Sequence, residues 1–508
     1  APELNANYSV NYSALCDVQN VTLSGSAYYD WEECEVTLSD LPHGACIAFG
    51  GNAAPTTTCR FQLDDVRVTV EEIYDLEGVV TGTVLYTDST PAAGVVVSDG
   101  FSVARTDSQG RYSLKTCEDT YYIYYSVPAD CEVTKNGYNQ PAFFTKYSSE
   151  QSVYDFTLTK LAGGVEEQFS LFVLADPQVR DTKEIGYFRN ETVPAVNTHI
   201  ATKQSAGMPC YGVTLGDVVY SEYGGRAGVA NTQPLMEPMR DEMQSISIPL
   251  FQTIGNHDYT YFGPDDKTSI NNYSGSSQQI KAQRAFEEVF GPINYSWNRG
   301  DAHIINMRNI YFKDAEGAFS DAGNYVMGFT DEQYEWLKND LQFVPLDKLI
   351  IFCVHIPVWN RSGSSYPNGA NVINLLRRYP NLHILSGHNH YMRYRECYTD
   401  VKEHTLAAVC GAWWSSKTNG DGAPNGYGVF DINGTAVANY YYMSSNGADD
   451  AACRDNQIRL YRGNHLSGGK YEYFAQQHGD GVLLANVFNA DDSWTVKVYE
   501  DGVYSGQM

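Results

Sequence analysis

Five short apolar segments of this chain each end in side chains that can bind a metal ion. The segments FVLA, YGVTL, FQTI, IIFCV and HILS are followed, in that order, by Asp176 with Gln178, by Asp217, by Asn256, by His355, and by His388 with His390. Apolar runs of this length, alternating with helical patterns, predict the buried strands of an α/β fold. Because open α/β sheets place their sites outside the carboxyl ends of the strands, we expect these side chains to meet in one crevice.

The chemistry of these side chains predicts a metal centre. Carboxylates, carboxamides and imidazoles form a mixed nitrogen and oxygen set that suits Mn, Fe or Zn. The seven residues are too many for one tetrahedral site and enough for two ions that share a carboxylate. We therefore predict two divalent metal ions as the cofactor.

The order of these motifs resembles that of the calcineurin-like metallophosphoesterase superfamily, in its multidomain bacterial type. The motifs read D-x-Q, G-D, G-N-H-D, a His that ends a strand, and G-H-x-H. The resemblance covers about residues 163–395 and implies an α/β catalytic domain, a β-sandwich of two mixed sheets flanked by helices. It also implies that the chain is an enzyme, a phosphoric ester hydrolase.

The resemblance further implies a role for each residue of the motifs. Asp217 would bridge the two ions. The remaining ligands would divide into two sets, Asp176, Gln178 and His390 for one ion and Asn256, His355 and His388 for the other. A hydroxide bridging the ions would attack phosphorus, and His257 would protonate the leaving oxygen. Asp258 would orient the imidazole of His257 or support its charge.

Two positions bear on the type of phosphoesterase. Many members of the superfamily carry His where Gln178 stands, and Gln there is similar to members that cleave nucleotide diphosphate compounds. Tyr220, in GDVVY, resembles the tyrosine that binds ferric iron in purple acid phosphatases, but those enzymes carry Gly at the position of Gln178. We therefore predict that Tyr220 packs behind the ligands and does not bind metal.

Four residues are candidates for substrate contacts. Asn360 and Arg361 follow the strand-ending histidine closely, and Trp413 and Trp414 stand in the segment CGAWW after the last motif. The tryptophans either stack on a base or sugar ring or join the catalytic and C-terminal domains, and the sequence leaves both interpretations open.

Changes in sequence texture predict four segments. Residues 1–74 are β-rich and resemble the end of a jelly-roll, and residues 75–162 resemble a small regulatory-type β-sandwich. Residues 163–395 form the catalytic domain, and residues 396–508 are expected to form a C-terminal β-domain. The chain is thus an α/β enzyme with all-β domains on both sides.

Charge and composition limit the partners. With 61 acidic and 34 basic residues the formal charge is −27, which argues against binding of DNA or RNA. No apolar run approaches the ~18 residues of a membrane-spanning helix. The expected partner is a small phosphorylated substrate, because two cations attract phosphate locally even in an acidic protein. The sequence does not indicate an oligomeric state.

The cysteines suggest where the protein acts. Cys16, Cys34, Cys46 and Cys59 crowd the N-terminal segment, and the printed sequence begins with Ala1. We expect an exported protein, periplasmic or at the cell surface.

Three functions remain possible at this stage. The first is hydrolysis of small organophosphates. The second is a phosphodiesterase or pyrophosphatase that acts on nucleotide or lipid-linked headgroups. The third, from a different class, is a surface binding protein with a vestigial phosphoesterase core.

Overall fold

The computed structural model describes most of the chain after its first 77 residues. The described ranges are 78–220, 233–259, 283–312, 325–358, 366–397, 401–445, 457–462, 481–491 and 493–507. The predicted N-terminal segment 1–74, with its four cysteines, lies outside them, and so do Asn360 and Arg361.

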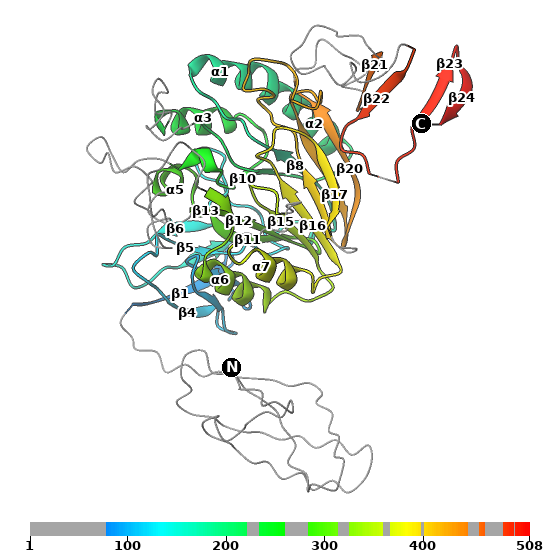
Figure 1. Cartoon of the computed structure of the whole chain (residues 1–508). Helices are drawn as coiled ribbons and strands as arrows, with labels where there is room; N and C mark the ends of the chain where they lie inside the picture. The colour runs from blue at the N-terminus through cyan, green and yellow to red at the C-terminus, as the bar shows by residue number, and fades with distance from the viewer. Residues whose placement is uncertain are drawn as a thin grey trace, which may run out of the picture. The chain divides into compact units, whose positions relative to one another are not determined.

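A small β-sandwich forms the first described part (blue to cyan in Figure 1). Its strands pair in two sheets of order β4-β1-β7 and β3-β2-β5-β6. The strands are β1 (Val79–Tyr86), β2 (Val96–Ser98), β3 (Val103–Arg105), β4 (Arg111–Lys115), β5 (Tyr122–Tyr125), β6 (Phe144–Lys146) and β7 (Phe156–Leu158). In β4, exposed residues alternate with the buried Tyr112 and Leu114, because successive side chains of a strand point to opposite faces.

Two mixed sheets form the catalytic part. The first has the order β10-β9-β8-β19-β20, with β8, β9 and β10 parallel and β19 and β20 antiparallel additions. Its strands are β8 (Gln168–Leu174), β9 (Cys210–Thr214), β10 (Leu250–Phe251), β19 (Gly426–Asn433) and β20 (Ala436–Ser444). The second has the order β11-β12-β15-β16-β18-β17. Its strands are β11 (Asn294–Arg299), β12 (Ala302–Met307), β15 (Leu349–Cys353), β16 (Asn381–Ser386), β17 (Arg393–Cys397) and β18 (Val401–Thr405).

The central strands are buried on both faces, and this explains their continuous apolar sequences. In β8, Leu171 and Val173 join the core that also contains Ile351 of the second sheet. Phe172 and Leu174 point to the opposite face of the strand. They join a different core cluster, which also contains the buried side chains of the helices. The predicted sandwich of mixed sheets flanked by helices is therefore confirmed.

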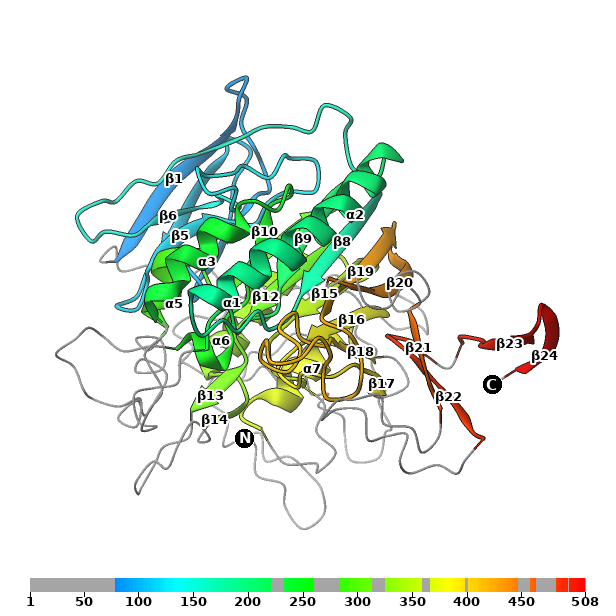
Figure 2. The ribbon, with the colours of Figure 1, turned by 90° about the horizontal axis from the view of Figure 1, so that it is seen from above.

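Helices cover the two sheets from opposite sides, with α1, α2 and α3 beside the first sheet and α6 and α7 beside the second (Figures 1 and 2). They are α1 (Thr182–Tyr187), the π-helical turn η2 (Phe188–Thr192), α2 (Val193–Ser205), the 3₁₀ turn η3 (Gln233–Leu235), α3 (Met236–Met243), α5 (Arg284–Phe290), α6 (Asp331–Leu341) and α7 (Gly369–Leu376). α6 begins with a capping box, in which Thr330 and Gln333 each accept the other's backbone N–H. Within the described residues, no helix is both long and apolar enough to cross a membrane.

The flanking segments are joined closely to the catalytic sheets. The sandwich contributes Tyr122, whose hydroxyl donates to the carbonyl of Glu287 at 2.7 Å, and Ser98, whose hydroxyl accepts from Trp336 at 3.0 Å. On the C-terminal side, β18, β19 and β20 pair within the two catalytic sheets. The domain boundary expected after residue 395 therefore falls inside the second sheet. Three further pairs of strands form separate two-stranded sheets among the described residues. They are β13 (Ile310–Phe312) with β14 (Tyr325–Met327), β21 (Ile458–Arg462) with β22 (Leu483–Val487), and β23 (Lys497–Glu500) with β24 (Val503–Gln507).

Candidate metal centre

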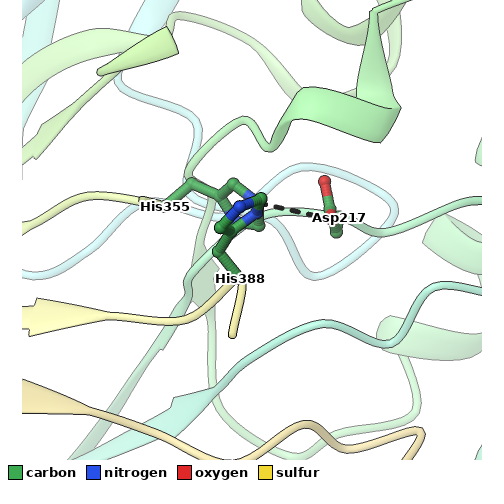
Figure 3. A group of neighbouring side chains, drawn as sticks. All are labelled: Asp217, His355 and His388. Carbon is green, nitrogen blue, oxygen red and sulfur yellow. Dashed lines mark hydrogen bonds and ion pairs between the residues drawn. The ribbon is translucent and has the colours of Figure 1, made fainter. Parts of the chain in front are cut away.

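The structure brings the strand-ending side chains of both sheets together. Asp217 follows β9, His355 follows β15 and His388 follows β16, and the potential ligand atoms of these three residues all lie within 4.8 Å of one another. Figure 3 shows the two imidazoles meeting beside the carboxylate. The convergence at the carboxyl ends of the strands, expected from the sequence, is present in the fold.

The atoms that meet at this point include several hydrogen-bond acceptors. His355 lies with Nδ1 2.7 Å from the carbonyl oxygen of Leu215, so Nδ1 carries a hydrogen and Nε2 of the neutral ring presents a lone pair. That Nε2 lies 2.9 Å from Oδ1 of Asn256, 3.3 Å from Oδ2 of Asp217 and 3.1 Å from Nδ1 of His388. Acceptors at these separations repel unless a cation or an extra proton lies among them. The donor set therefore fits a divalent metal ion.

A second group of predicted ligands borders the first. Asp176 follows β8, and its Oδ1 lies 3.5 Å from Nε2 of His390. The other ring nitrogen of His390, Nδ1, lies 3.1 Å from the carbonyl oxygen of Gly411, so this imidazole has the same arrangement as His355. Gln178 donates to Oδ2 of Asp217 at 3.0 Å, and its Oε1 is buried with no hydrogen-bond partner. An unsatisfied buried oxygen on a side chain that contacts a carboxylate also fits a cation.

The backbone is strained where these ligands are presented. Five predicted ligands have left-handed φ values between 42° and 68°, namely Asp176, Gln178, Asp217, His388 and His390. Such a conformation costs about 1–3 kcal/mol for a residue other than glycine, and it clusters at functional sites. The preceding Gly216 has φ +88°, and a Cβ there would lie 2.6 Å from the backbone of Gly255. The close packing of the two loops thus requires glycine.

Burial and neighbouring charges shift the pKa values in the cluster. Burial lowers the pKa of His355, but the carboxylates of Asp217 and Asp176 and the carbonyl of Leu215 together outweigh it and raise the pKa to about 9. Burial raises the pKa of Asp217, and the imidazoles of His355 and His257 together lower it below the usual range. Burial and the charge of His355 lower the pKa of His388 to about 4. In the absence of metal, a proton on His355 thus supplies the positive charge that the acceptor cluster requires.

His257 lies at the edge of the cluster. Its backbone N–H donates to Oδ1 of Asp217 at 2.8 Å, and its ring stacks on Tyr220 with 5.0 Å between centroids. His257 is partly exposed, and its backbone is held by Asp217, a predicted metal ligand. This places a proton-transfer group beside the proposed site of the ions.

Asp258 makes contacts different from those expected. Its carboxylate accepts from the backbone N–H groups of Gly255, Val218 and Val219 at 2.8, 2.9 and 3.2 Å. It therefore ties together the loops that follow β9 and β10 and makes no hydrogen bond to the ring of His257. Burial and the charge of Asp217 raise the pKa of Asp258. The expected orientation of the imidazole by Asp258 is replaced by stacking on Tyr220.

The two predicted tryptophans differ in their surroundings. Trp414 donates from Nε1 to the carbonyl of Pro177 at 2.8 Å and stacks on Tyr187. Trp413 is 40% exposed, and its ring centroid lies 5.0 Å from that of His390.

Three groups were not identified from the sequence. They are the carbonyls of Leu215 and Gly411, and Arg180, which contacts both Glu184 and Trp413. A carbonyl has no side-chain signature. The only sequence signal for Arg180 is its position two residues after Gln178.

Three family models match the chain. The model described as calcineurin-like phosphoesterase matches residues 209–392. The models described as the N terminal and the C terminal of calcineurin-like phosphoesterase match residues 78–161 and 403–508. The chain belongs to the calcineurin-like phosphoesterases, with this multidomain layout, and is a phosphoric ester hydrolase.

Solved structures similar to this chain include three phosphatases or nucleotidases. A dimetal phosphatase from Danio rerio is 14% identical, covering 55% of this chain and 99% of that one with a TM-score of 0.33. Purple acid phosphatase PPD1 from yellow lupin (Lupinus luteus) seeds is 13% identical, covering 74% and 69% with a TM-score of 0.37. A 5'-nucleotidase from Candida albicans is 11% identical, and the match covers 55% of this chain and 51% of that one with a TM-score of 0.33. No curated protein matches the sequence.

Proposed function

We propose that this phosphoesterase uses two divalent metal ions to hydrolyse phosphate esters of small molecules. The observation that carries the proposal is the convergence of His355, Asn256 and Asp217, whose acceptor atoms lie 2.9 and 3.3 Å from one imidazole nitrogen. Three acceptors so placed form a site for a cation.

The chain's own residues would hold the ions in two adjoining sets. Asp217 lies between the sets, because its Oδ2 lies 3.3 Å from Nε2 of His355 and also accepts a hydrogen bond from Gln178 at 3.0 Å. Asn256, His355 and His388 would hold one ion, and Asp176, Gln178 and His390 the other. When bound, such ions supply a Lewis acid for the phosphoryl oxygens and acidify a water. Mn, Fe and Zn all suit this donor set.

His257 would act as the general acid. The ring of His257 stacks on Tyr220, and its backbone N–H donates to Asp217, so the ring is held beside the ligands. The hydrogen bond to Asp217 uses neither ring nitrogen. A ring nitrogen is therefore available to protonate the leaving oxygen. Asp258 would act indirectly, by fixing the loop that carries His257.

A diester or pyrophosphate substrate is the second candidate. Gln178 supplies a neutral amide oxygen where an imidazole would bind an ion more tightly, and that oxygen has no protein partner. A surface binding protein is the third possibility, and such a protein would not hydrolyse phosphate esters.

Turnover of two model substrates distinguishes these candidates. We expect protein supplied with Mn to hydrolyse p-nitrophenyl phosphate, and faster turnover of bis-p-nitrophenyl phosphate would favour the diesterase. The matched control is the same protein after chelation, which should recover activity when metal is restored. Absence of turnover of either substrate by metal-replete protein would contradict the enzymatic proposals.

We also propose that the protein is exported, on the basis of the four N-terminal cysteines. Mass spectrometry of the unreduced native protein tests this, since disulfides among them are expected in an oxidising compartment. Four free thiols would argue against export.

A further inference from the structure

Trp413 combines exposure with a fixed position next to the metal centre. Its ring lies 5.0 Å from that of His390, a proposed ligand, and 40% of the residue is exposed. A large aromatic side chain exposed at a catalytic site, rather than packed in the core, is available to a ligand.

The backbone around Trp413 is held in a costly conformation. Trp413 and Trp414 have φ values of 49° and 56°, where residues other than glycine are rarely found. Gly411 has φ +57°, and a Cβ there would lie 2.0 Å from Oδ1 of Asn425. Contacts on both sides compensate, since Trp414 donates to Pro177 and the Trp413 carbonyl accepts from Arg180 at 2.6 Å. The indole is thus preorganised before any ligand arrives.

Arg180 extends this surface toward the proposed general acid. Its guanidinium donates to Glu184 at 2.8 Å from Nε and contacts the same carboxylate from Nη2. The guanidinium also lies 5.9 Å from the ring centroid of Tyr220, which stacks on His257. We call Trp413, Arg180 and Tyr220 the leaving-group rim, because they connect the surroundings of His390 with those of His257.

The position of the rim indicates what it binds. If His257 protonates the leaving oxygen, the leaving group must lie beside His257, and the rim borders that place. The guanidinium of Arg180, whose side chain is 42% exposed, adds N–H groups to the rim, while its charge is paired with Glu184. An indole face beside a guanidinium suits a planar ring linked to an anionic group.

We propose that the leaving-group rim selects phosphate esters whose leaving group carries a planar ring, such as a nucleobase, which stacks on Trp413. This inference rests on the proposed function, because it assigns His257 to the leaving-group side. Arg180 is a positioning residue for Trp413 through the bond to its carbonyl.

A pair of esters with the same leaving oxygen tests the proposal. Adenosine 5'-monophosphate and ribose 5-phosphate both release a primary alcohol, and they differ in the base. We expect kcat/KM of the wild type to favour the nucleotide by about tenfold or more, as base stacking on an aromatic ring predicts. Trp413→Ala should bring the ratio close to one, and Trp413→Phe should restore most of it.

The control variant is Tyr138→Ala. Tyr138 is equally exposed, at 41%, and has Arg240 over its ring at 3.6 Å, but it lies in the N-terminal sandwich segment. Its removal should leave the ratio of the two esters unchanged. Equal kcat/KM values in the wild type, turnover of neither ester by protein that hydrolyses p-nitrophenyl phosphate, or an unchanged ratio in Trp413→Ala would overturn the inference.

Calorimetry separates this inference from the proposed function. Failure to hydrolyse even p-nitrophenyl phosphate would refute the proposed function alone. Binding of the two esters to metal-replete protein then decides the inference without turnover. Adenosine 5'-monophosphate should bind about tenfold more tightly than ribose 5-phosphate, and Trp413→Ala should abolish the difference. Equal or absent binding of both esters would overturn the inference.

Discussion

The second sheet contains two contacting pairs of histidines with opposite properties. His355 and His388 follow the ends of β15 and β16, and 3.1 Å separates their nearest nitrogens. His383 and His404 lie within β16 and β18, and 3.2 Å separates theirs. The distances are nearly equal, so proximity of two imidazoles does not by itself make a metal site.

The surroundings of the pairs account for the difference. Asp217 and Asn256 face His355, and the carboxylate raises the pKa of His355 to about 9. The rings of Tyr394, Phe430 and Tyr440 surround His404 instead, and burial lowers its pKa to about 3. A buried histidine near a carboxylate suits a cation, whereas one among aromatic rings is neutral packing.

The largest expected effect comes from removing the carboxylate. Asp217→Asn should lose bound metal and activity together, with a fall in rate beyond the roughly 10⁴-fold upper range of acid catalysis. Metal analysis and steady-state kinetics on the same preparation measure both. The variant should also lose the thermal stabilisation that added metal gives the wild type, about 2.7 kcal/mol at a hundredfold excess over the dissociation constant. Full metal content in this variant would contradict the assignment of Asp217.

The next effect isolates acid catalysis from metal binding. His257→Ala should keep its metal and lose about 10²–10⁴ in kcat, because no ring nitrogen remains to protonate the leaving oxygen. The rate for an ester with a strongly acidic leaving alcohol should fall less, since that oxygen needs no proton. A metal-free His257→Ala protein would show that His257 acts as a ligand.

The ligands at the strand ends were predictable from the sequence, but the backbone carbonyls that orient them were not. Continuous apolar runs such as LIIFC identify buried strands, and the polar residue after each run identifies the site. The carbonyls that orient His355 and His390 belong to Leu215 and Gly411, which no side-chain pattern marks. The pairing of β18, β19 and β20 within the two catalytic sheets was not predictable, because short β-runs do not reveal which sheet they join.

The same limit applies to Asp258. The family resemblance implied that this carboxylate orients the ring of His257, its neighbour in the sequence, or supports its charge. The 3₁₀ turn η4 (Asn256–Asp258) instead directs the carboxylate toward backbone N–H groups of two loops. Neighbours in sequence diverge in a turn, so adjacency is a poor guide to side-chain contact there.

The smallest expected effect concerns His404, which contacts His383 and lies among aromatic rings. His404 has a pKa of about 3 in the fold and about 6.5 when unfolded, so the unfolded chain binds more protons between these values. The stability that the neutral ring contributes is complete above pH 6.5 and is lost as the pH falls toward 3. By linkage, lowering the pH from 7.5 to 5 costs about 2 kcal/mol from this group. His404→Phe should remove that part of the acid sensitivity.

Urea unfolding of both proteins at the two pH values measures this difference. The wild type should lose about 2 kcal/mol more than His404→Phe, whatever the effect of the substitution at pH 7.5. His404→Phe should also retain bound metal, which Asp217→Asn should not. An equal acid sensitivity of the two proteins would mean that His404 takes up a proton as readily in the fold as in the unfolded chain, and the aromatic surroundings would then not keep it neutral.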